Sequence, residues 1–556
     1  MTQTPTSTIA LLRDVLRPSN IFLVAGVYIV YRVVYDLFIW RKFLSPFRHL
    51  PSPPGSEALF GHTRRILNDE TGVMLREWVK KYGPVLRIAG PGSNHNILIV
   101  EHEHLDKVLG KEAHDYPKVC LFRFFPRTDH PYHLLSVLEI ISGHGLFATT
   151  GDEHRLLRRA MSTAFSITNM MAQEHFHHEV TDRLVKLWKD QIGSATEPSK
   201  GKIINLYDYM SKATLDIISL AGFGYDADTL HNPENELAVA YKGRTRVQSG
   251  PNVLKLFYSM SIPGALKFVR SKWLYANRQW LIYTQPSADL GLLVESMQSI
   301  TQLARGILDE KILESASESA IEAKRDIMSI LVRARKEELE KGPTAYTISD
   351  EVLTDQVLTF LGAGHTTTAI TLTWALWSLA NDQKSQNRLR EEITPVLDAN
   401  SHPDYRTLKA LPWLDSVIME TLRIFPPVQV DMRIADKTDY IGDVLVPKGS
   451  LIFIPIFVIN TYKGTWGEDA EEFNPSRWLN LPETYHPHYS VLSFIAGPHH
   501  CIGRTMALME MKAVLASLIY NFKFEPSFKG QTANLRRGIF MKFMDGMPVN
   551  ISRARD

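Results

Sequence analysis

Apolar residues recur at helical spacing along much of this chain, which predicts a mainly α-helical fold. One such pattern covers 350–361, and Ser349 stands before it as a residue type that caps helix N-termini. Others cover 151–165, 414–425 and 506–519. Helices therefore supply most of the predicted core.

Two kinds of segment interrupt the helical pattern and predict small β-sheets. Residues 84–89 and 96–100 are rich in β-branched residues and flanked by Gly or Pro, as expected of short strands. Residues 444–449 and 451–455 are spaced closely enough to predict a hairpin.

The apolar run over 20–40 is long enough to cross a membrane, since a spanning helix needs about 20 apolar residues. Arg32 and Asp36 interrupt the run one helical turn apart, where each partly neutralises the other. A helix lying in the membrane interface is the alternative. We expect a tail and membrane anchor over 1–40, a proline-rich hinge over 41–56 and a catalytic domain over 57–556.

Positive charge follows the apolar run, at Arg41, Lys42 and Arg48. By the positive-inside rule, this side of the anchor faces the cytoplasm. The expected location is the endoplasmic reticulum membrane, with the catalytic domain on its cytoplasmic side.

The amino-acid composition argues against several classes of protein. A hydrophobic content of 44% and a charged content of 22% are those of a globular protein. The net charge of +2 gives no overall attraction for nucleic acid. Only 2 cysteines are present, which argues against a disulfide framework and a multi-cysteine zinc site.

Cys501 lies in a tight loop, between Gly497 and Gly503 and just before a predicted helix. A helix N-terminus favours a thiolate, and a single thiolate suits the axial position of a haem iron. A buried structural cysteine is an equal alternative on the loop alone. A zinc site formed with His499 and the adjacent histidine is less favoured, because consecutive residues do not readily close on one tetrahedral ion.

The loop resembles the haem-binding loop of cytochrome P450 monooxygenases, Phe-x-x-Gly-x-Arg-x-Cys-x-Gly. Phe494, Gly497, Cys501 and Gly503 match that pattern, whereas His499 stands where the family has arginine. The resemblance implies a cytochrome P450 fold that holds haem b, with Cys501 as the axial ligand of its iron.

Two further segments resemble parts of the family that contact the haem carboxylates. The segment 151–158 is similar to the Gly-x-x-Trp-x-x-x-Arg helix, with His154 in the tryptophan position and Arg158 in the arginine position. Arg433 resembles a further carboxylate-binding arginine of the family. The resemblance implies that these side chains, with His499, bind the haem carboxylates.

The helix beginning near 350 contains Gly362 and Gly364, each costing about 1 kcal/mol relative to alanine, so a close approach or an opening for a small molecule is expected there. A dinucleotide-binding loop is disfavoured, because Thr367 stands where its third glycine belongs. The segment resembles the family's Ala/Gly-Gly-x-Asp/Glu-Thr-Thr/Ser motif. Thr367 matches the threonine that assists dioxygen activation, and Thr366 replaces the acid. Proton delivery is therefore expected from water, from His365 or from the hydroxyls of Thr366 and Thr367.

Glu420-x-x-Arg423 matches the family's Glu-x-x-Arg motif, and Arg477 falls in a segment that supplies a third partner. The resemblance implies that these residues support the cysteine loop. The implied reaction is hydroxylation or epoxidation of a hydrophobic small molecule, with terpenoids or other secondary metabolites as the expected class.

No nicotinamide or flavin motif is visible, so electrons are expected from an NADPH-cytochrome P450 reductase. Two alternatives stay open: a haem-thiolate peroxygenase or isomerase that needs no reductase, and a haem-binding protein without turnover.

Overall fold

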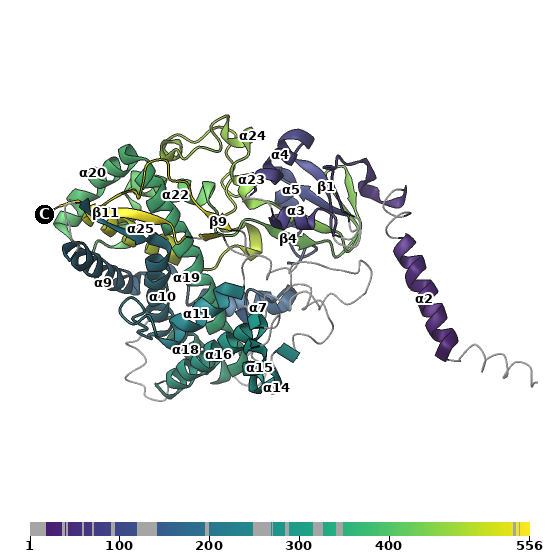
Figure 1. The fold of residues 1–556 in the computed structure, drawn as a ribbon, viewed down its shortest axis with the longest axis horizontal. Helices are drawn as coiled ribbons and strands as arrows, with labels where there is room; N and C mark the ends of the chain where they lie inside the picture. The colour runs from purple at the N-terminus through teal and green to yellow at the C-terminus, as the bar shows by residue number, and fades with distance from the viewer. Residues whose placement is uncertain are drawn as a thin grey trace, which may run out of the picture.

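The computed structural model describes residues 18–35, 39, 43–57, 60–68, 72–90, 95–118, 142–194, 200–247, 268–269, 271–283, 288–314, 326–340, 348–536, 541–543 and 545–555. Helices form most of the body and small β-sheets lie among and beside them, as the sequence predicts (Figure 1). The helices before residue 350 are α2 (Pro18–Val34), α3 (Thr63–Asn68), α4 (Val73–Tyr82), α5 (His102–Leu105), α7 (Gly151–Ser162), α8 (Ile167–Ala172), α9 (Glu174–Gly193), α10 (Leu206–Phe223), α11 (Glu236–Val247), α14 (Lys272–Ala276), α15 (Arg278–Tyr283), α16 (Ala288–Glu314) and α18 (Ile327–Glu340).

The remaining helices are α19 (Asp350–Asn381), α20 (Gln383–Ala399), α21 (Tyr405–Lys409), α22 (Pro412–Ile424), α23 (Ile456–Asn460), α24 (Lys463–Trp466) and α25 (Arg504–Asn521). Short turns of tighter or wider helix are η2 (Pro46–His49), η4 (Asp106–Lys111), η7 (Pro475–Leu479) and η8 (Gly497–His499).

The largest described sheet brings together two segments that are far apart in the sequence. Its strand order is β1-β2-β7-β4, formed by Val85–Ala89, His95–Ile99, Leu451–Ile454 and Asp431–Ile434. Strands β2 and β7 are parallel, whereas the two outer pairs are antiparallel. A second sheet has the order β3-β11-β8 (Lys202–Asn205, Pro548–Arg553, Phe522–Pro526). The described residues also form two small pairs, β5-β6 (Asp439–Ile441, Val444–Val446) and β10-β9 (Lys542–Phe543, Leu535–Arg536).

The strand predictions over 84–89 and 96–100 are confirmed by β1 and β2. The predicted hairpin between 444–449 and 451–455 is wrong. Strand β6 pairs with β5, and β7 instead lies between β2 and β4. The apolar alternation in these strands suits a buried sheet, but it does not select the partner strand.

Helix α19 runs through the middle of the body and organises the core (Figure 1). The Ser349 hydroxyl accepts a hydrogen bond from the Val352 N–H and starts the helix, as the sequence predicts. Apolar residues cover most of its circumference, which is typical of a helix buried on all sides. A Cβ atom on Gly364 would lie 2.8 Å from Cγ1 of Ile218 in α10, so helix packing explains this glycine.

The structure agrees with only part of the prediction for the N-terminal residues, a membrane-anchoring helix. Helix α2 has 17 residues and projects from the body, at the purple end of the ribbon (Figure 1). In the described part of the chain no helix has both the length and the apolar character needed to cross a membrane, so the transmembrane helix predicted over 20–40 is not confirmed. Residues 1–17, which belong to the same predicted unit, lie outside the described residues.

Candidate active site

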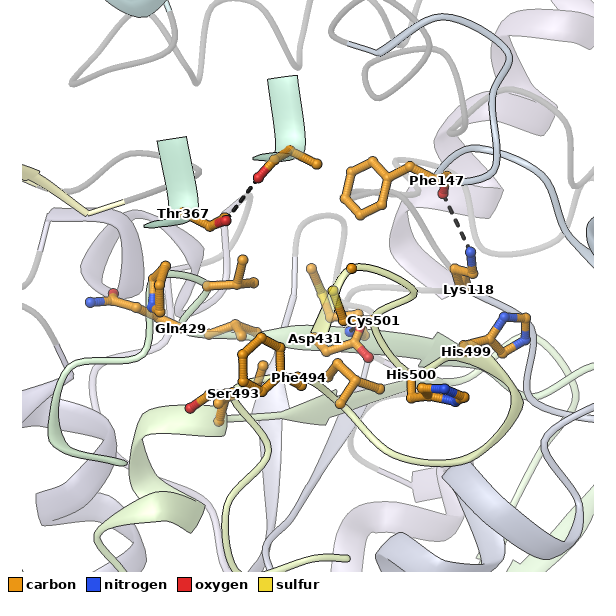
Figure 2. Close-up of a pocket in the computed structure, with 18 of the residues that line it drawn as sticks. Lys118, Phe147, Thr367, Gln429, Asp431, Ser493, Phe494, His499, His500 and Cys501 are labelled. Atoms are coloured by element: carbon orange, nitrogen blue, oxygen red, sulfur yellow. Dashed lines mark hydrogen bonds between the residues drawn. The ribbon is translucent and has the colours of Figure 1, made fainter. Parts of the chain in front are cut away.

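A cavity of about 480 Å³ lies between α19 and the loop that carries Cys501. Figure 2 shows Thr367 across this cavity from Cys501, with Lys118, His499 and His500 gathered at one edge. The other walls come largely from apolar and aromatic side chains, among them Leu146, Phe147, Phe165, Phe360, Val428 and Phe453. Such a cavity suits a mainly apolar ligand with a polar edge.

The Cys501 loop is held in shape by its own backbone. The Cys501 N–H donates to the Phe494 carbonyl over 2.8 Å, which closes the loop. Gly497 has a φ of 69°, and a Cβ atom there would lie 1.7 Å from the Leu109 carbonyl oxygen in η4. Ile495 has a φ of 56°, a left-handed conformation that costs a β-branched residue about 1–3 kcal/mol. The fold therefore imposes this loop conformation. An isoleucine does not favour it, so the sequence did not predict it at Ile495.

The Cys501 side chain opens into the cavity, three residues before α25 begins. Burial raises the pKa of the thiol, while a hydrogen bond from Gly503 and the charges of Arg158 and Arg504 lower it. A bound metal cation reverses the effect of burial, because coordination deprotonates a thiol outright. Phe494 and Gly503 also line the cavity, as the resemblance implies for this loop.

His154 and His499 come together at the polar edge. His154 is buried on α7, and its Nε2 lies 3.4 Å from Nδ1 of His499, with the ring centroids 4.3 Å apart. Burial, and then the charge of Lys118, lower the pKa of His154 to about 3 and that of His499 to about 2. Both rings are therefore neutral, and they are hydrogen-bonding groups at this edge and not cations.

The two predicted arginines occupy the same edge with different partners. Helix α7 places Arg158 one turn after His154, so both side chains lie on the same face. Arg158 donates to the His500 carbonyl over 2.5 Å and contacts Nε2 of the His500 ring at 2.9 Å. The other predicted arginine, Arg433, is buried on β4 and donates to Oδ1 of Asp431 over 2.6 Å. Its Nε has no hydrogen-bond partner among the described residues, and such a buried orphan donor fits an anionic ligand nearby.

Helix α19 sorts the three predicted catalytic residues onto different faces. Thr367 lines the cavity, and its hydroxyl donates to the Ala363 carbonyl over 2.8 Å. His365 is buried away from the cavity, against Tyr241 with ring centroids 4.7 Å apart, and its Nδ1 lies 2.8 Å from the Leu361 carbonyl. The Thr366 hydroxyl lies 3.1 Å from Nε2 of His365. Neither residue is part of the cavity wall, so the expectation that both act beside Thr367 is not confirmed.

Glu420, Arg423 and Arg477 meet as the sequence predicts, and all three are buried. Arg423 donates to both Glu420 oxygens, at 2.8 and 2.9 Å, and Arg477 donates to one of them at 2.9 Å. The Asn474 N–H and the Trp478 indole N–H complete the shell around the carboxylate. Every strong acceptor position is used, as a buried charge requires.

Asn460 connects this cluster to the cysteine loop, and sequence reasoning missed it. Its backbone carbonyl accepts from Arg423 at 3.0 Å. Its side chain accepts from the Leu492 N–H at 2.8 Å and donates to the Ser493 hydroxyl at 2.9 Å, at the start of the loop. No motif marks an isolated asparagine after an apolar segment, so the sequence carried no usable signal.

Two more cavity residues were also missed. Lys118 lies at the polar edge, where its amine donates to the Leu146 carbonyl over 3.2 Å. Glu510 on α25 is buried in the cavity wall, and burial raises its pKa well above the ordinary value. In the sequence, Glu510 falls on the apolar stripe of the predicted helix. An acidic residue at such a position is the signal that could have identified Glu510 as a buried cavity residue.

The cavity fits a planar, iron-bearing group with two carboxylates. It has a cysteine on one side, a hydroxyl on the helix opposite and cations along one edge. These features define the haem-thiolate class of site.

Comparison with known proteins supports the assignment of a haem-thiolate site. Residues 51–543 match the family model described as Cytochrome P450. Cytochrome P450 monooxygenase 205 of Postia placenta is 32% identical to this chain, covering 86% of this chain and 87% of its own. The monooxygenase sphH of Aspergillus fumigatus is 28% identical, covering 93% of this chain and 90% of its own. FSL4 of Gibberella zeae, also a monooxygenase by name, is 26% identical, covering 94% and 91%. The chain therefore belongs to the cytochrome P450 monooxygenase family, whose oxidoreductases bind haem through a cysteine thiolate.

Proposed function

We propose that this protein inserts one oxygen atom of dioxygen into a C–H or C=C bond of a hydrophobic small molecule. The other oxygen atom leaves as water, with two electrons and two protons consumed. The apolar cavity between Cys501 and Thr367 is the observation that carries this proposal. A terpenoid or another secondary metabolite is the proposed substrate class, in keeping with the fungal relatives.

Cys501 is proposed as the axial ligand, in a loop shaped by Phe494, Gly497 and Gly503. The bound haem would supply oxygen activation, which a cysteinate ligand promotes by pushing electron density to the iron. The protein's own contribution is to hold the sulfur under the cavity, exclude water with apolar walls and neutralise the cofactor's carboxylates.

His154, Arg158, Arg433 and His499 are the proposed partners of those carboxylates. Arg158 and Arg433 provide the charge, and the neutral histidines provide N–H donors. Glu420, Arg423 and Arg477 support the loop through Asn460.

Thr367 is proposed to position a proton at its hydroxyl oxygen. The hydroxyl hydrogen is engaged with the Ala363 carbonyl, which leaves the oxygen free to accept a hydrogen bond from water in the cavity. Thr366 stands in the acid's position but faces His365, so this chain supplies no acid from that position.

We propose that an NADPH-cytochrome P450 reductase supplies the electrons and that the protein works at the endoplasmic reticulum membrane, with its catalytic domain facing the cytoplasm. Leu23, Val24, Val27 and Val30 of α2 are each more than 60% exposed, and membrane contact would cover this apolar surface. In this proposal residues 1–40 attach the protein, 41–56 form a hinge and 57–556 form the haem-thiolate domain. Release of the protein from microsomes by high salt alone would contradict attachment through α2.

The function is tested by metabolite profiling of cells that express the chain with its reductase, against matched cells carrying Cys501→Ala. A new oxygenated product only with the intact chain, together with a red-shifted Soret band of the reduced carbon monoxide complex, is the expected result. Products formed from peroxide, or without any reductase, would indicate a peroxygenase or isomerase. A haem spectrum without product over a broad panel of hydrophobic substrates would indicate a haem-binding protein without turnover.

A further inference from the structure

One face of the largest sheet forms a wall of the cavity, and Asn96 of β2 stands on that face. Residues directly opposite each other on neighbouring strands point to the same side of a sheet. Asn96 pairs with Ile88 of β1. It also lies level with Leu451 of β7, because Ile97 pairs with Ile452. Asn96, Ile88 and Leu451 all line the cavity, as this register requires.

The Asn96 amide has apolar neighbours on this face. Phe453 of β7 and Met432 of β4 pair with each other and also line the cavity. Asn96 is only 9% exposed, and its side chain has no hydrogen-bond partner among the described residues. An amide offers two donor hydrogens and an acceptor oxygen, and burying them unpaired is unfavourable. A ligand in the cavity would supply the missing partners.

Thr63 adds a second uncharged polar group at the same end of the cavity. The His62 N–H donates to the Ala89 carbonyl over 2.7 Å, and the Ala89 N–H donates to Nδ1 of His62 over 3.1 Å. These bonds hold the start of α3 against the end of β1, where Ala89 pairs with His95, the residue before Asn96 (Figure 1). Thr63 lines the cavity and is 5% exposed, and its hydroxyl has no partner in the described part of the chain.

This pair of polar groups is separate from the edge of the cavity that holds His499. Lys118, at that edge, bridges Arg433 on the far side of β4. The order β1-β2-β7-β4 therefore puts three strand spacings between Asn96 and the backbone at Lys118. With about 4.8 Å between neighbouring strands, the separation is roughly 14 Å. Haem carboxylates at the His499 edge do not account for Asn96 and Thr63.

We propose that the Asn96 amide, together with the Thr63 hydroxyl, binds an uncharged oxygen function of the substrate, at a point remote from the carbon that is oxidised. The inference rests on the proposed monooxygenase function and narrows its substrate class. The substrate is an apolar molecule that already carries a hydroxyl or carbonyl group. A carboxylate is disfavoured, because neither an amide nor a hydroxyl neutralises a buried charge.

The test measures the binding of n-alkanols, and of n-alkanes of matching length, to the purified, haem-loaded full chain. The shift of the Soret band on addition of each probe reports binding, and the comparison uses the chain length whose alcohol binds most tightly. Asn96→Leu is expected to weaken binding of the alcohol about fivefold relative to the alkane, the effect of one lost hydrogen bond. Thr63→Val removes the hydroxyl at nearly constant volume and is expected to act in the same direction, by about threefold.

Gln429→Leu is the matched control, because this amide also lines the cavity but lies beyond the other end of β7. Its backbone carbonyl accepts from the Phe457 N–H, whereas Asn96 is level with the first residue of β7. Figure 2 shows Gln429 on the side of the cavity where Thr367 lies. Gln429→Leu is expected to leave the ratio of alcohol to alkane affinity unchanged.

An unchanged affinity ratio in Asn96→Leu would overturn the inference, and so would an equal selective loss in Gln429→Leu. Failure of every alkanol to bind the haem-loaded wild-type protein would also overturn it. The red-shifted Soret band of the reduced carbon monoxide complex shows that each variant is folded around its haem. Absence of that band from the wild-type protein would instead overturn the proposed function, so the two failures are distinguishable.

Discussion

Replacing Glu420 by glutamine tests whether the buried charge cluster stabilises the site. Glutamine has nearly the same shape, but it carries no charge and offers one acceptor oxygen in place of two. The Glu420 carboxylate accepts bonds from Arg423, Arg477, Trp478 and the Asn474 N–H. In the variant, an amide N–H₂ group faces donors that cannot accept its hydrogens.

The magnitude follows from what each arginine retains. Arg477 still meets the Asp469 carboxylate at 2.9 Å, so its charge remains partly compensated. Arg423 is left with the carbonyls of Asn460, Ala470 and Glu472. Breaking a buried ion pair from one side costs about 3–5 kcal/mol, a large part of the roughly 5–15 kcal/mol that stabilises a typical domain. For Glu420→Gln we expect a loss of about 4–5 kcal/mol of folding free energy. Nearly all of it arises at Arg423, which loses its charge partner, and little arises at Arg477.

The assay is the temperature of half-loss of the Soret band of the haem-loaded protein. We expect it to fall by about 4 °C, because an unfolding entropy of about 2 cal/mol/K per residue, over roughly 500 residues, converts the cost at Arg423 to a shift of that size. Glu472→Gln is the control, because its side chain is exposed and only its backbone carbonyl contacts Arg423. A midpoint for Glu420→Gln within about 2 °C of that control would refute the reasoning, since it would mean that the cluster contributes no net stability.

Three other substitutions perturb the cysteine loop or the cavity wall. Asn460→Ala leaves the buried Leu492 N–H without its acceptor and is expected to cost about 1–3 kcal/mol, measured as faster haem loss and a lower half-loss temperature; a wild-type rate would count against the link to the loop. Gly497→Ala is expected to abolish the red-shifted carbon monoxide band, because its Cβ would meet the Leu109 carbonyl at 1.7 Å; an unchanged band would show that the loop can move. Glu510 has a folded pKa above its ordinary value of 4.5, so its contribution to stability is present below that value and is lost as the pH rises toward the folded pKa. Glu510→Gln is therefore expected to raise the half-loss temperature at neutral pH and to change it little near pH 4, and the opposite pH trend would contradict a neutral buried acid.

Much of the site could be predicted because its chemistry is local in sequence. The Cys501 loop, the start of α19 at Ser349 and the Glu420–Arg423 pair each depend on neighbours a few residues apart. Glycine chemistry, capping and helical spacing encode such features directly. The positions of Arg158 and His154 on one face of α7 follow from the same spacing.

The missed features depend on contacts between distant segments. The parallel pairing of β2 with β7 joins Ile97 to Ile452, and no local rule selects that partner. Asn460 gains its role only from the meeting of α22 with the cysteine loop. His365 is different, because helical geometry held the answer: Ala363 and Thr367 are one turn apart and share the cavity face, which puts the intervening His365 on another face.

The distribution of polar groups in the cavity affects which substrates the enzyme binds. Lys118, His499 and His500 gather at one edge of the cavity (Figure 2). Phe147, Phe360 and Ala363 are among the apolar residues that line its walls. The Thr367 hydroxyl donates to its own helix, so it is not available as a donor to a substrate. A substrate held there gains affinity from buried apolar area, at about 25 cal/mol per Å², and not from hydrogen bonds donated by α19. Shape therefore decides which carbon lies above the sulfur, and the regiochemistry of the product should respond more to the volume of residue 363 than to any polar substitution on α19.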